Sequence, residues 1–143
     1  MPDAAWWAQL LLVAAAAHTG LETVVHLVVY PALARVSGSD DGLAGHQDHM
    51  RRMSVAVAPV YGLLAVASVG MAAVDPSPWS LAALGLVLAT FAVTALAAVP
   101  AHEAVLRAAA ADRPRLHRRL ARADLARLVL SVVLLGVAWA LAR

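Results

Sequence analysis

The sequence predicts an all-α integral membrane protein, a four-helix bundle with both termini on the non-cytoplasmic side. Its 143 residues are 62% hydrophobic and only 14% charged, whereas soluble domains are about half apolar and about one quarter charged. The apolar residues form four stretches, each near or above the roughly 20 residues that a spanning helix needs. These features exclude a soluble globular domain and a disordered chain. The absence of cysteine excludes a disulfide framework and thiolate metal sites.

The four predicted spans belong to one domain and occupy residues 6–36, 53–74, 79–101 and 120–142. The first span follows Met-Pro-Asp. It lacks a basic leading segment and is longer than the apolar region of a signal peptide, so we expect it to be retained. The second and third spans are separated by Asp75-Pro76-Ser77-Pro78, whose prolines are typical of a turn. The other two connections, around residues 37–50 and 103–119, are longer and polar.

Charge placement predicts the orientation of the chain. Nine of its eleven arginines lie in or beside the first and third connections, and Arg127 lies slightly deeper on the same side. The positive-inside rule places that side in the cytoplasm. All four tryptophans fall near the opposite face, where an aromatic belt is expected. We expect the lipid bilayer as a partner and no nucleic acid, because topology and anionic headgroups already account for the arginines. A homo-oligomer is compatible with this pattern.

Ionisable residues inside the spans are candidates for function, because a charge within the bilayer is costly. His18, Glu22 and His26 are spaced four residues apart in the first span, which places them on one helix face. Asp124 and Arg127 share one face of the fourth span. We expect a Glu22–Arg127 ion pair with Asp124 as a second carboxylate. This group is either a structural ion pair that fixes helix register or part of a site.

The histidines suggest a metal site, since all six lie on the same side of the membrane as the arginines. The candidate ligands are Glu22, His26, His46, His49 and His102. Imidazole and carboxylate ligands suit iron, copper, manganese or zinc. The alternatives are that His46 and His49 cap the second helix and that His102 reaches water from a helix end. His117 lies in an arginine-rich connection and is predicted to be solvated.

Several short motifs carry a resemblance to known families. They are His26-Leu-Val-Val-Tyr30-Pro31-Ala-Leu, His46-x-x-His49 with Pro59 thirteen residues after His46, Val99-Pro100-Ala-His102, and the arginine-rich opening of span 4. Over most of the chain this pattern resembles a group of uncharacterised small membrane proteins of bacteria, which implies a multi-pass protein of the bacterial inner membrane. More distantly it is similar to the anthrone oxygenase-like (DUF1772) family, whose W…N…R signature is replaced here by Leu116-His117-Arg118…Arg122-Ala-Asp124. That resemblance implies oxidation of polyketide anthrones by dioxygen.

Three functions follow from these residues. The first is a membrane-embedded oxidoreductase or oxygenase, predicted by its candidate ligands to be metal-dependent, acting on a small lipophilic substrate, which the resemblance implies to be aromatic and polyketide-like. Its candidate catalytic residues are His18, Glu22, Asp124 and Arg127. A metal would activate dioxygen or water, Arg127 would stabilise an oxyanion, and a metal-free version with His18 and Glu22 as base is equally compatible. The second is a redox or metal carrier, with haem on His18 and His102 as one form. The third is a non-catalytic membrane scaffold.

Overall fold

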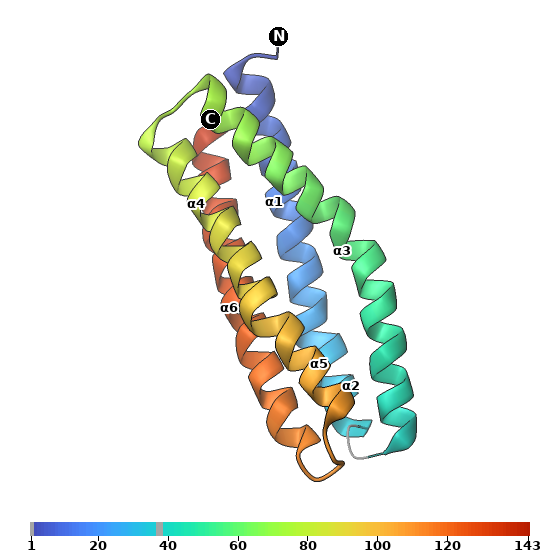
Figure 1. The fold of residues 1–143 in the computed structure, drawn as a ribbon. Helices are drawn as coiled ribbons and strands as arrows, with labels where there is room; N and C mark the ends of the chain where they lie inside the picture. The colour runs from blue at the N-terminus through green and yellow to red at the C-terminus, as the bar shows by residue number, and fades with distance from the viewer. Residues whose placement is uncertain (1, 37–38) are drawn as a thin grey trace.

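The computed structural model describes residues 2–36 and 39–143 as a bundle of four long helical rods (Figure 1). The first rod is α1 (Ala4–Val24), η1 (Val25–Val29) and α2 (Tyr30–Val36); the second is α3 (Asp40–Val74); the third is α4 (Pro78–Val93), η2 (Thr94–Ala98) and α5 (Val99–Arg107); the fourth is α6 (Arg113–Leu141). Each rod is long and apolar enough to cross a membrane. All secondary structure in the described residues is helical, in agreement with the predicted fold class.

The rods extend beyond the apolar stretches at the end that carries residues 39 and 108–112, which we call the polar end. There α3 begins at Asp40, α5 ends at Arg107 and α6 begins at Arg113. Hydropathy marks where a helix meets lipid, but a helix continues as long as its backbone hydrogen bonds do. The long polar connections expected from the sequence are therefore mostly helix. His46, His49, His102 and His117 lie on helices rather than in loops.

The rods pack as a ring in which each contacts two neighbours. Helix α1 packs against α3 and α6, and α4 packs against the same two helices from the other side. Both termini lie at the end opposite the polar end (Figure 1). The core near the termini is apolar and rich in alanine, and small side chains let membrane helices approach closely. A smaller apolar cluster around Val25, Tyr30, Val105 and Leu120 lies toward the polar end.

Two wide π-helical turns, η1 and η2, interrupt the first and third rods before a proline. In η1 the Tyr30 N–H donates to the Val25 carbonyl, and Pro31 follows Tyr30. In η2 the Val99 N–H donates to the Thr94 carbonyl, and Pro100 follows Val99. Proline lacks an N–H, and its ring clashes with the carbonyl four residues earlier. A wider turn accommodates the proline without ending the helix, and such turns are frequent at functional sites. Both lie beside the polar residues described next.

Candidate functional site

A buried arginine between two carboxylates forms the centre of the polar network. The Arg127 Nη2 atom lies 2.9 Å from Asp124 Oδ1 and 3.3 Å from Glu22 Oε2. Asp124 is fully buried and Glu22 is 2% exposed. The contact between Glu22 and Arg127 that the sequence predicts is present, with Asp124 as the second carboxylate. It joins α1 to α6 within the bundle.

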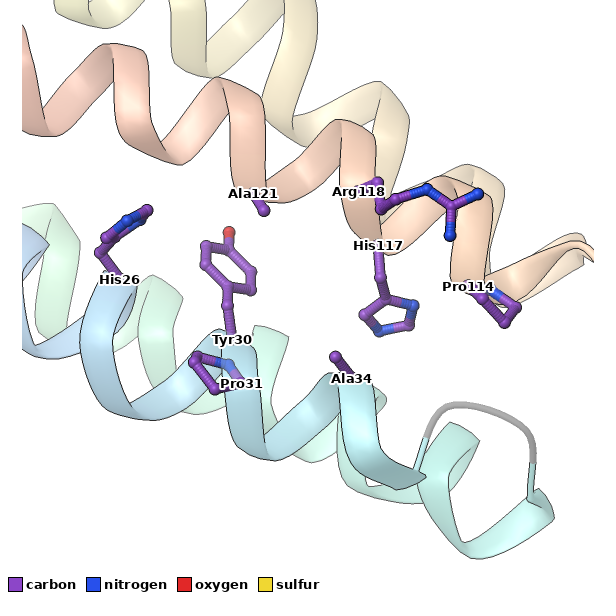
Figure 2. Close-up of a pocket in the computed structure, with 8 residues that line it drawn as sticks. All are labelled: His26, Tyr30, Pro31, Ala34, Pro114, His117, Arg118 and Ala121. Carbon is purple, nitrogen blue, oxygen red and sulfur yellow. The ribbon is translucent and has the colours of Figure 1, made fainter.

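His26 is hydrogen-bonded to the same group on its other side. Its Nδ1 atom lies 2.7 Å from Asp124 Oδ2. Because a carboxylate accepts, Nδ1 donates, and the neutral ring carries its lone pair on Nε2. The His26 side chain is 27% exposed and lines a cavity of about 400 Å³ between the first rod and α6. Figure 2 shows His26 and Tyr30 on one wall of this cavity and His117, Arg118 and Ala121 on α6 opposite.

His18 lies one helical turn from Glu22 on the side away from the polar end. Its Nε2 atom is 3.5 Å from Glu22 Oε1, and its ring centroid is 5.4 Å from that of Tyr61. The imidazole is fully buried, and neither ring nitrogen has a hydrogen-bond partner. His18 therefore contacts the carboxylate centre without lining the 400 Å³ cavity. A direct role in substrate chemistry stays a prediction for this residue.

A second polar group extends from Tyr30 toward the polar end. The Tyr30 hydroxyl lies 3.2 Å from His102 Nε2, and His102 Nδ1 lies 3.1 Å from His46 Nε2. One ring nitrogen of His46, Nδ1, is buried without a partner. The His49 ring centroid is 6.2 Å from that of His102. These contacts place three of the predicted ligands near one another.

The prediction that His117 is solvated is wrong. The residue is only 7% exposed. Its Nδ1 donates to the Arg113 carbonyl at 3.0 Å, and its ring centroid lies 5.4 Å from that of His46. The arginine-rich sequence predicts a connection at residue 117, but α6 begins at Arg113. Because the chain is already helical at residue 117, the imidazole lies inside the bundle.

The five predicted metal ligands are divided between two groups. Glu22 contacts Arg127 and His26 contacts Asp124, whereas His46, His49 and His102 lie nearer the polar end. Among the described residues, no three His, Asp or Glu side chains are arranged to hold one ion. These donors do not fit a single coordination sphere as they stand. The bound metal stays a prediction.

A smaller cavity of about 140 Å³ lies on the other side of the polar network. It is lined by His49 and Met53 of α3, by Thr94 of η2, and by His102 and Arg127. The polar network thus borders two cavities: His26 lines the larger one and Arg127 lines the smaller one. The smaller cavity is below the 300–1,000 Å³ typical of pockets for drug-sized ligands. The volume of this cavity is therefore too small for a haem bound to His102.

Three polar residues that line the large cavity were not among the predicted site residues. They are Tyr30, His117 and Arg118. The Tyr30-Pro31 dipeptide is visible in the sequence, and a proline inside an apolar span signals a local irregularity. The positions of His117 and Arg118 follow only from where α6 begins. Comparisons with protein-family models, curated proteins and solved structures found no match.

Proposed function

We propose that this protein is a membrane-embedded oxidoreductase of the oxygenase type, in which His26 removes a proton from a small lipophilic substrate. One observation carries the acid–base part of this proposal. His26 forms a 2.7 Å hydrogen bond to a buried carboxylate while also lining a cavity of about 400 Å³. A base oriented by an acceptor and in reach of a substrate is the arrangement that general acid–base catalysis requires.

Each member of the dyad has a distinct role in this mechanism. Asp124 accepts from Nδ1, which fixes the ring orientation and leaves Nε2 of the neutral ring free to accept a proton. When Nε2 takes the substrate proton, the carboxylate stabilises the resulting imidazolium. Asp124 is a positioning residue here, since it acts through His26. Arg127 in turn holds Asp124 at 2.9 Å.

The buried centre contains more negative than positive groups when both of its carboxylates are ionised. Glu22 and Asp124 bring two carboxylates, while Arg127 brings one permanent positive charge. Uncompensated charge is costly in a low-dielectric interior. With both carboxylates ionised, a proton on His26 makes the four-residue centre neutral. The site is thus suited to accept a proton from a substrate and to release it again.

The location of the large cavity supports a lipophilic substrate. It lies between two rods that are long and apolar enough to cross a membrane. The side chains of Leu27 and Val28, next to His26 in the sequence, and of Leu125, next to Asp124, are exposed. In the proposed orientation the arginine-rich polar end faces the cytoplasm and both termini lie outside the bacterial inner membrane. A substrate dissolved in the bilayer would then reach His26 near the cytoplasmic leaflet.

The oxidative part of the proposal rests on the resemblance to anthrone oxygenase-like proteins. In such a reaction a CH₂ group loses its first proton to His26 Nε2, and the carbanion reacts with dioxygen. One oxygen atom becomes the product carbonyl, and the other leaves as water with the two hydrogens of the CH₂ group. Dioxygen is the four-electron oxidant that balances the step. The residues of this chain supply proton transfer and charge stabilisation.

The test uses the full chain in lipid nanodiscs with 1,8-dihydroxyanthrone as the probe. Oxygen consumption and quinone absorbance are measured for wild type, His26→Gln, Asp124→Asn and the matched control Thr23→Val on the same helix. Loss of a general base reduces rates by about 10²–10⁴-fold, so we expect that loss for His26→Gln and an unchanged rate for the control. Equal rates for His26→Gln and wild type, both folded by thermal melting, would refute the proposal.

A redox or metal carrier is the second candidate, favoured by the imidazoles at the polar end. The ring centroids of His46 and His102 are 5.0 Å apart, and His49 and His117 lie beside them. Metal analysis and a visible spectrum of the purified protein test this candidate. A near-stoichiometric metal that His46→Ala and His102→Ala remove would favour the imidazoles at the polar end, and one that Glu22→Ala and His26→Ala remove would favour the other group of predicted ligands. A Soret band would favour haem. If the protein shows no bound metal, no Soret band and no turnover, the non-catalytic scaffold is the remaining candidate.

A further inference from the structure

Arg118 is an arginine near the polar end that lines the cavity containing His26, and it has no carboxylate partner among the described residues. Arg51, Arg52 and Arg107 each pair with a carboxylate one turn away. Within the part of the chain that the structure describes, no ion pair involves Arg118. Its guanidinium instead extends over the end of the large cavity near Pro114 (Figure 2).

His117 lies at the same end of the cavity. Its Nδ1 is engaged with the Arg113 carbonyl at 3.0 Å, so the neutral ring carries its lone pair on Nε2. The residue is nine-tenths buried, and its ring points between the two helices toward Ala34 (Figure 2). The ring therefore contributes a polar but uncharged surface beside Arg118.

The remaining walls of the cavity are neutral and mostly apolar. Pro31 and Ala34 line one side, Pro114 and Ala121 line the other, and no acidic side chain contributes. The cavity therefore combines one permanent positive charge with small apolar surfaces. This combination suits a flat apolar molecule that carries one negative charge.

We propose that the cavity binds an amphipathic organic anion, whose acidic group lies at Arg118 and whose apolar body extends past His117 to His26. This inference rests on the proposed function only in naming His26 as the reacting end. His26 and Ala34 lie eight residues apart on one rod, which corresponds to about 12 Å along a helix. The acidic group and the reacting atom of the substrate are thus separated by about 12 Å, a distance that requires an extended apolar body such as a system of fused rings.

The shared chemistry is an anion beside an apolar body, which a free carboxylic acid and a phospholipid headgroup both offer. Equilibrium binding distinguishes them, using anthraquinone-2-carboxylate and its neutral carboxamide as unreactive probes. Both are titrated into the full chain in phosphatidylcholine nanodiscs, with empty nanodiscs as the blank. We expect the carboxylate to bind about tenfold more tightly than the carboxamide, the size of one charge-assisted hydrogen bond.

Two arginine variants and a second lipid complete the experiment. Arg118→Gln should abolish the preference for the carboxylate, whereas Arg122→Gln, an exposed arginine on the same helix, should retain it. Equal affinities for the two probes, or the same loss in both variants, would overturn the proposal. Loss of carboxylate binding in nanodiscs with phosphatidylglycerol would assign the site to a lipid headgroup and overturn it as a substrate site. Because binding is measured without turnover, the test of the anion site is independent of the proposed reaction at His26.

Discussion

Removing the positive charge of Arg127 should destabilise the bundle strongly. Its Nη2 atom lies within 3.3 Å of one oxygen of each of two buried carboxylates. Arg127→Gln leaves Glu22 and Asp124 facing each other without compensation. Breaking a buried ion pair by removing one partner costs about 3–5 kcal/mol, and we expect a loss of that size in the free energy of unfolding.

A double-mutant cycle shows whether the loss comes from charge. Glu22→Gln in the Arg127→Gln background removes one of the two uncompensated carboxylates, so it should restore part of the lost stability. Residues in one network show coupling of about 0.5–3 kcal/mol. Unfolding is followed by circular dichroism in mixed micelles of increasing sodium dodecyl sulfate content, with Arg122→Gln as the control. A loss below about 1 kcal/mol for Arg127→Gln, or strict additivity of the two changes, would refute the reasoning.

Two further outcomes follow from the packing and from the polar chain. A methyl group at Gly70 would overlap the Trp7 ring, whereas one at Gly62 would meet nothing within 4 Å. Gly70→Ala should therefore lower the melting temperature by several degrees, and Gly62→Ala should not; equal melting temperatures would contradict the packing of α1 on α3. His102→Gln removes the ring nitrogen that faces the Tyr30 hydroxyl at 3.2 Å, so it should slow turnover while leaving probe binding at Arg118 unchanged. Weaker probe binding in this variant would instead show that the two groups are coupled.

The sequence determined the elements of the bundle and one contact between them. Four apolar stretches identified the four membrane-capable helices, because the length of a spanning helix is set by the bilayer. Spacing along the helix placed His18 and Glu22 on one face, and they are in contact. The cost of an unpaired charge in lipid pointed to Arg127 as the partner of Glu22, and the structure has that pair.

Only the tertiary structure decided how the polar residues are distributed. The His26–Asp124 pair joins residues 98 positions apart, and the His46–His102 pair joins residues 56 positions apart. The relative rotation and register of the helices bring these side chains together, and close packing across the bundle sets both. The hydropathy of the sequence does not determine this rotation and register. The burial of His117 and the cavity beside Arg118 depend likewise on α6 beginning at Arg113, ahead of the apolar stretch, because backbone hydrogen bonding rather than hydropathy determines where a helix begins.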